Sequence, residues 1–185
     1  MPRIALNSSQ SLICVVDLQA RFLSGIHEAE RVVDRTTFLV KAAKELGIPI
    51  IGTEQNVDRM GATLPEISEY FSHPAIPKMY FGAVEADGFL QALEHYDRTQ
   101  ILLVGIETHI CVSLTALELV SRGYHVGVCP DATSARTQDR HKLGMERMRD
   151  GGIVPAHTEA IAYEWMQTAS HPKFRAVLDH VKNHP

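Results

Sequence analysis

Short apolar segments alternate with longer segments of helical periodicity along this chain, and this alternation constrains the fold more than any other feature. Six strands are expected, at residues 11–16, 49–53, 75–78, 100–104, 124–129 and 153–156. Helices are expected at residues 29–46, 64–71, 86–96, 112–121, 138–149, 159–167 and 173–182. Because the strands are apolar at nearly every position, they indicate a parallel sheet that is covered by helices on both faces.

Right-handed crossovers between such strands predict the strand order 3-2-1-4-5-6. We therefore expect a single doubly wound α/β domain over residues 1–185, with a six-stranded, mainly parallel sheet and helices on both faces. In this order strands one and four are neighbours at the topological switch point. Open α/β sheets bind ligands there, at the carboxyl ends of the strands.

The charge pattern offers no basis for binding a polyanion. The formal net charge is -4, and the lysines and arginines are scattered rather than clustered. We therefore expect neither nucleic-acid nor membrane partners. The first eight residues do not form a signal peptide, and no segment approaches the roughly 18 apolar residues of a membrane span. A cytoplasmic protein is expected.

The three cysteines do not suggest a disulfide framework, since their number is odd and their spacing is unpaired. Cys14 and Cys129 lie inside apolar strands and are expected in the core. Cys111 instead lies between a strand and a helix. Free backbone N–H groups and the positive end of the helix dipole would favour its thiolate there. Cys111 is therefore a candidate nucleophile, and a small residue that merely fits is the alternative.

Two charged residues are candidates for the same site. Asp17 ends the first strand, and the predicted strand order brings it beside Cys111. Lys78 ends the third strand, two places from the first, so its long side chain must reach across. An aspartate at this position is commonly a turn or helix cap, and a lysine is usually solvated, so both structural interpretations stay open.

Five segments carry a resemblance to a known family. They are Val-Val-Asp-Leu-Gln at 15–19, Thr-Glu-Gln at 53–55, Pro-Lys at 77–78, Gly-Ile-Glu-Thr-His-Ile-Cys-Val at 105–112, and Pro-Asp-Ala at 130–132 with Ser134. Together they resemble the isochorismatase-like cysteine hydrolases, specifically small isochorismatase-domain proteins of the Thr-Glu-Gln type. The resemblance extends from about residue 11 to residue 158.

The resemblance implies roles by position. Asp17, Lys78 and Cys111 match the base, the cation and the nucleophile of the family's triad. The Ile106–Glu107 bond matches the position of a cis non-proline peptide. The backbone N–H groups of Glu107 and Cys111 would then bind a developing oxyanion. The resemblance also implies a homo-oligomer, a dimer or larger, and the apolar helix after Cys111 offers soft support.

One departure bears on cofactors. The nicotinamidase branch of the family carries an Asp-x-His metal motif after the second strand, whereas residues 53–60 here contain no histidine. No metal and no cofactor are therefore expected. His109 lies in the segment before Cys111, and we interpret it as a loop or interface residue rather than as a second base.

Several further residues are candidates for substrate contacts, because they follow the expected strands or flank the triad. They are Gln19, Phe22, Glu54, Gln55, Phe81 and Thr108. Core packing is the alternative for the aromatic residues, including Tyr80.

The sequence thus favours a metal-independent cysteine hydrolase that acts on a small amide or related carbonyl compound through a thioester. Two alternatives remain open: hydrolysis of a vinyl ether, as isochorismatases perform, and a non-catalytic binding or scaffold role. A dinucleotide-dependent enzyme is disfavoured, because no Gly-x-Gly-x-x-Gly follows the first strand.

Overall fold

Six parallel strands form one sheet in the order β3-β2-β1-β4-β5-β6, in a computed structural model that describes residues 5–184. The strands are β1 (Ser11–Val16), β2 (Ile50–Gln55), β3 (Ile76–Lys78), β4 (Gln100–Ile106), β5 (His125–Ser134) and β6 (Val154–Pro155). The predicted order is confirmed, and every strand pairing is parallel.

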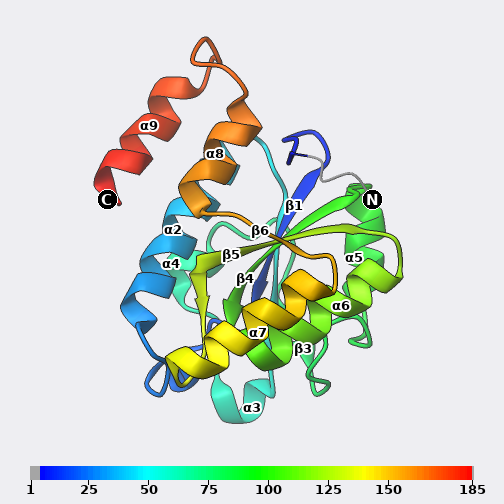
Figure 1. The fold of residues 1–185 in the computed structure, drawn as a ribbon. Coiled ribbons are helices and arrows are strands. Elements are labelled where there is room, and N and C mark those ends of the chain that lie inside the picture. The colour runs from blue at the N-terminus through cyan, green and yellow to red at the C-terminus, as the bar shows by residue number, and fades with distance from the viewer. Residues whose placement is uncertain (1–4, 185) are drawn as a thin grey trace.

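Helices cover both faces of the sheet (Figure 1). They are α1 (Ala20–Leu23), α2 (Ala29–Glu45), α3 (Val57–Met60), α4 (Pro65–Ser68), α5 (Phe89–Tyr96), α6 (Ser113–Ser121), α7 (Gln138–Asp150), α8 (Thr158–Met166) and α9 (Phe174–Asn183). A π-helical turn, Thr108–Val112, links β4 to α6.

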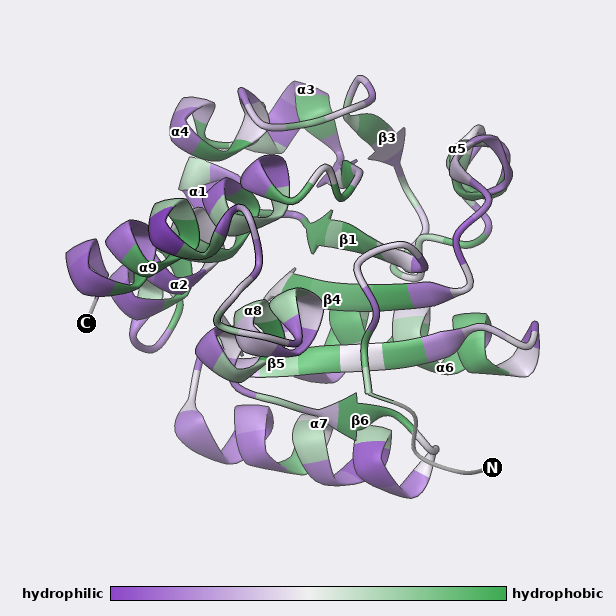
Figure 2. Cartoon of the chain, turned by 90° about the horizontal axis from the view of Figure 1, so that it is seen from above, coloured by the Kyte–Doolittle hydropathy of each residue, from purple (hydrophilic) through white to green (hydrophobic). Residues whose placement is uncertain are grey.

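The core consists of two apolar layers, one on each face of the sheet. On one face Leu12, Cys14 and Val16 of β1 pack with side chains of α5, α6 and α7. On the other face Ile13 and Val15 pack with side chains of α2, α8 and α9. The central strands are accordingly hydrophobic along most of their length (Figure 2). The continuous apolar character of the strands follows from this two-sided burial.

Some element boundaries differ from the predicted ones. Strand β5 continues through Pro130 to Ser134, because after a register shift near Leu103 its last residues pair with the end of β4. The short helices α1 and α3 follow β1 and β2, where no helix was expected. Helix α5 begins at Phe89, three residues later than predicted.

Candidate active site

Asp17 lies at the carboxyl end of β1 and is almost completely buried. Its backbone is left-handed, with φ of 52°, and its N–H donates to the carbonyl of Thr53 at 3.1 Å. The carboxylate accepts two hydrogen bonds. Thr53 Oγ1 donates to Oδ1 at 2.8 Å, and Lys78 Nζ donates to Oδ2 at 2.7 Å. The carboxylate is therefore fixed from two neighbouring strands.

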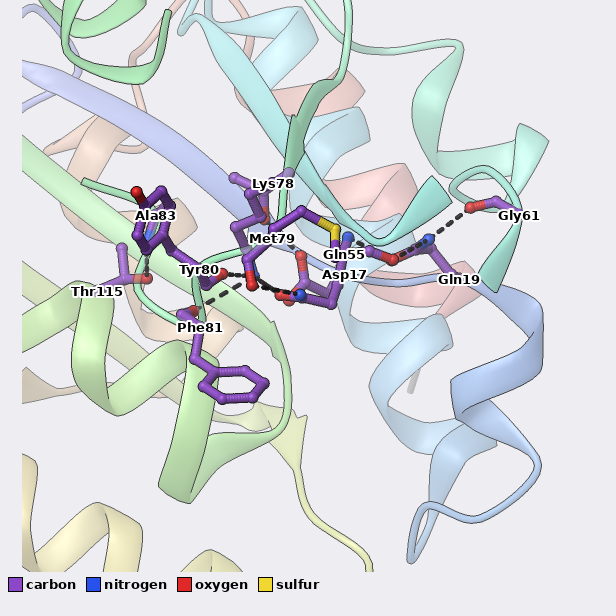
Figure 3. Close-up of polar contacts among 11 residues, drawn as sticks. Asp17, Gln19, Gln55, Gly61, Lys78, Met79, Tyr80, Phe81, Ala83 and Thr115 are labelled. Carbon is purple, nitrogen blue, oxygen red and sulfur yellow. Dashed lines mark hydrogen bonds and ion pairs between the residues drawn. The ribbon is translucent and has the colours of Figure 1, made fainter. Parts of the chain in front are cut away.

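Lys78 reaches this carboxylate from the end of β3, which pairs with β2 so that Gln55 and Lys78 lie opposite each other. Its ammonium donates to Asp17, to Gln55 Oε1 at 2.6 Å, and to the carbonyls of Tyr80 and Phe81 at 3.3 and 3.2 Å (Figure 3). A buried ammonium needs such a set of acceptors, because it has left water. Lys78 thus joins Asp17 to the segment that follows β3.

Cys111 completes the group from the 108–112 turn. The exposed fractions are 2% for Asp17, 4% for Lys78 and 8% for Cys111. Asp17 and the backbone of Glu107 both act on the Cys111 thiol, since Asp17 raises its pKa and Glu107 lowers it. Three residues far apart in the sequence therefore meet in a nearly closed site beside the switch point.

The protonation state of Cys111 corrects the expectation from sequence. Burial raises the pKa of the Cys111 thiol to about 12, and the negative charge of Asp17 adds to this rise, while Lys78 and the Glu107 N–H oppose it. The expected helix start is instead a π-helical turn, and α6 begins only at Ser113. At neutral pH Cys111 is therefore a thiol beside a carboxylate, not a preformed thiolate.

The Ile106–Glu107 peptide bond is cis, at the position that the family resemblance indicates. The preceding Gly105 has φ of 110°, and a Cβ built on it would lie 2.1 Å from the carbonyl oxygen of Val16. Only glycine allows β4 to approach β1 this closely. The Glu107 carbonyl accepts hydrogen bonds from the N–H groups of Ile110 and Val112, at 3.0 and 3.3 Å, and so closes the turn.

The side chain of Gln55 lies in this group, whereas Gln19 contacts Asp17 only through its backbone N–H, which donates to the Asp17 carbonyl at 2.8 Å. Gln19 is fully buried, and its amide bonds to the backbone of Gln55 and Gly61 (Figure 3). Glu54 accepts from the N–H of Thr63 at 2.7 Å. The Gln19 amide and Oε1 of Glu54 thus both bond to the backbone of residues 55–63, and their expected contacts with substrate stay predictions.

The remaining residues that were expected to contact a substrate fall into two groups, one packed inside the protein and one exposed. Phe22 packs against the core layer on the α2 face, so the core alternative describes it. Thr108 is fully buried, and its hydroxyl is 2.8 Å from Nδ1 of His141. Phe81 is exposed and lies next to the site, together with Met79 and Tyr80.

Sequence reasoning missed the hydrogen bond from Thr53 to Asp17 and the pairing of His141 with Thr108. The alternation of side chains along a strand was a usable signal for the first, because residues 53 and 55 face one side and residue 54 the other. His141 gave no local signal, since it lies 33 positions from Thr108.

Within residues 5–184, which the structure describes, no group of three or more His, Cys, Asp or Glu side chains is arranged to hold a metal ion. None of the helices in that part of the chain is both long and apolar enough to cross a membrane.

Comparison with known proteins identifies the family. The model of the isochorismatase domain matches residues 11–160. The chain is 34% identical over 173 residues to mouse isochorismatase domain-containing protein 2A, covering 93% of this chain and 82% of the mouse protein. The chain belongs to the isochorismatase family.

Solved structures show the same family fold. A protein described as MAR1 ribonuclease from Caenorhabditis elegans is 29% identical, with a TM-score of 0.91 and coverage of 98% of this chain and 95% of the other. The YcaC protein of Escherichia coli, described as an octameric hydrolase of unknown specificity, is 24% identical, with a TM-score of 0.93 and coverage of 100% and 92%. This chain therefore has the fold that is found in these solved structures.

Proposed function

We propose that this chain is a metal-independent cysteine hydrolase of small amides or related carbonyl compounds. The observation that carries the proposal is the buried contact of Asp17 with both Lys78 and Cys111. A thiol that donates to a fixed carboxylate has a base in place for its proton. The cation on the opposite oxygen holds that carboxylate in position.

The proposed reaction begins with proton transfer. As the Cys111 sulfur attacks the substrate carbonyl carbon, its proton passes to Asp17, so no free thiolate with a pKa near 12 has to accumulate. The carbonyl oxygen gains negative charge in the tetrahedral intermediate. The N–H groups of Glu107 and Cys111 are assigned to this oxyanion. Support for the Glu107 assignment comes from the effect of its backbone on Cys111, whose pKa it lowers.

Collapse of the intermediate breaks the carbon–nitrogen bond. Asp17 returns the proton to the departing nitrogen, which leaves as an amine or ammonia, and a thioester remains on Cys111. Water then attacks the thioester while Asp17 takes its proton. The second tetrahedral intermediate releases the carboxylic acid and the proton returns to the sulfur. Lys78 keeps its place throughout, because its four acceptors are all within the protein.

A second candidate, a binding protein with little turnover, is favoured by one observation. The triad is nearly closed to solvent, and the thiol is protonated at neutral pH. The segment after Lys78 is tied to this site, because Lys78 Nζ donates to the carbonyls of Tyr80 and Phe81.

A comparison of turnover by wild type and by a cysteine variant distinguishes a cysteine hydrolase from a binding protein. A panel of small primary amides, together with p-nitrophenyl acetate, is assayed with wild type, Cys111→Ala and Cys129→Ala. Cys129 is the matched control, since it is also a buried thiol but lies on the opposite face of the sheet. We expect turnover by wild type and Cys129→Ala, and none by Cys111→Ala. Equal turnover by all three proteins excludes the cysteine mechanism, and no turnover by wild type favours the binding role.

The same three proteins are also tested for two further reactions. Release of pyruvate from isochorismate would indicate vinyl ether hydrolysis, which needs no cysteine nucleophile. Cleavage of RNA, the activity in the description of the C. elegans relative, would contradict the expectation drawn from the scattered basic residues. We expect neither product.

A further inference from the structure

The segment that begins α7 binds the two residues after the cis peptide bond. Arg136, just before the helix, donates from its N–H and from Nε to Oε2 of Glu107, each at 3.1 Å. His141, in the first turns of the helix, lies 2.8 Å from the Thr108 hydroxyl through Nδ1. Glu107 and Thr108 stand between β4 and Cys111, so one segment holds both residues that lead into the 108–112 turn.

The next turn of α7 lies directly on this backbone. A Cβ built on Gly144 would be 2.8 Å from Cα and 2.9 Å from N of His109. Met145 and Met148 continue the same buried face of the helix toward the core. Because Gly144 follows His141 by three positions, the two contacts lie one above the other along the helix. Helix α7 therefore has no space to shift relative to the turn.

The contact between Thr108 and His141 also satisfies a buried polar group. Thr108 is fully buried, and His141 is the partner of its hydroxyl. Burial, with a contribution from Arg31, lowers the pKa of His141, so the imidazole is neutral near neutral pH. In the tautomer that carries its proton on Nε2, Nδ1 accepts the hydrogen bond that the Thr108 hydroxyl donates. Removing the imidazole leaves this hydroxyl without a partner.

We propose that His141 is a positioning residue that acts through Thr108 to fix the turn carrying Cys111 and the proposed oxyanion-binding N–H groups. His141 touches no reacting atom itself. The inference rests on the proposed cysteine hydrolase function and adds to it a residue of α7 outside the triad. Arg136 supports the same turn by holding the Glu107 side chain.

A positioning role predicts a specific kinetic pattern. Groups that bind only the transition state change kcat, whereas groups that bind the substrate equally in both states change KM. A small displacement of catalytic groups costs up to about 100-fold in rate. We therefore expect His141→Ala to lower kcat by about 10- to 100-fold while KM stays within about twofold.

Two conservative variants test whether Nδ1 of His141 is the atom that holds the Thr108 hydroxyl. Asparagine places a side-chain carbonyl near the position of Nδ1, whereas glutamine reaches toward that of Nε2. His141→Asn should therefore restore most of kcat, and His141→Gln should not. His180→Ala is the control, because His180 is also a partly buried helical histidine with a pKa lowered by burial, but it lies in α9.

The experiment measures kcat and KM for p-nitrophenyl acetate together with amide hydrogen exchange of residues 105–113. We expect faster exchange in His141→Ala, protection restored in His141→Asn, and wild-type behaviour in His180→Ala. Wild-type kcat and exchange in His141→Ala would overturn the inference, as would equal loss of kcat in the Ala and Asn variants.

Different results would contradict the proposed cysteine hydrolase function and the proposed positioning role of His141. If Cys111→Ala is inactive but His141→Ala has wild-type kcat, only the positioning role is wrong. If Cys111→Ala stays active, the cysteine mechanism is wrong, whatever His141 does. If wild type shows no turnover at all, hydrogen exchange still decides: unchanged exchange in His141→Ala overturns the inference, and faster exchange that asparagine reverses supports it.

Discussion

Lys78 Nζ and Asp17 Oδ2 lie 2.7 Å apart inside the protein, with both side chains almost completely removed from solvent. The pair spans three strands, because β3 and β1 are separated by β2. This contact orients the carboxylate whose charge also raises the pKa of Cys111. Stability and the proposed chemistry therefore depend on the same two charges.

Removing the cation should destabilise the fold. Lys78→Met keeps the length of the side chain but leaves the Asp17 carboxylate buried and unpaired, which typically costs about 3–5 kcal/mol. Urea unfolding monitored by circular dichroism measures this loss. The matched control is Lys173→Met, which removes an exposed ion pair with Glu45 and should cost at most about 1 kcal/mol.

The double variant Asp17→Asn with Lys78→Met extends the same measurement. It removes both charges, so we expect it to regain part of the stability that Lys78→Met loses, without regaining turnover. If the double variant is no more stable than Lys78→Met, the unpaired carboxylate does not explain the loss.

The reactivity of Cys111 should increase when the proposed base is removed. Asp17 raises the pKa of Cys111 and Lys78 lowers it. Asp17→Asn deletes the raising charge and leaves the lowering one, so the pKa of Cys111 falls. We expect faster alkylation by iodoacetamide between pH 7 and 9 in Asp17→Asn than in wild type, together with loss of turnover. Labelling is located by peptide mass spectrometry, and a slower reaction in the variant would contradict this electrostatic assignment.

Much of the fold could be predicted because burial on both faces leaves a direct trace in sequence. The strands at the centre of the sheet are apolar throughout, which separates a parallel from an antiparallel sheet. The end of β5 left no such trace. Pro130, Asp131 and Thr133 are typical of a loop, and only pairing with β4 beyond the register shift makes them part of a strand.

The site could be predicted in part. Strand order alone brings Asp17 and Cys111 together at the topological switch point. It does not determine that burial would raise the pKa of Cys111, since burial depends on the packing of the core around the thiol. The pairing of His141 with Thr108 depends on how α7 packs, which one sequence does not encode locally.

Gly105 should tolerate no side chain. A Cβ there would lie 2.1 Å from the backbone oxygen of Val16, and φ of 110° is unfavourable for any other residue. We expect Gly105→Ala to cost more than about 3 kcal/mol, measured by thermal or urea unfolding. Gly47→Ala is the control, because Gly47 also has positive φ, at 68°, but no atom lies within 4 Å of the added Cβ. A similar cost for both variants would show that the contact with Val16 is unimportant.

The segment after Lys78 should contribute to self-association. Met79, Tyr80 and Phe81 are consecutive and 69%, 62% and 60% exposed, and exposed apolar patches commonly mark interfaces. The family resemblance in the sequence predicts a homo-oligomer, and this segment is a candidate for its interface. Sedimentation velocity should give a species larger than a monomer for wild type and a smaller one for Tyr80→Ser with Phe81→Ser. A monomeric wild type would contradict the proposal.

The most direct test of the central claim is the intact mass of the protein after acid quench during reaction with p-nitrophenyl acetate. The proposed mechanism predicts one added acetyl group in wild type, located on Cys111 by peptide mapping, and none in Cys111→Ala. Because the thioester forms before water attacks, the adduct should appear within the first turnovers. Turnover without an adduct on Cys111, or an equal adduct in Cys111→Ala, would contradict the assignment of Cys111 as the nucleophile.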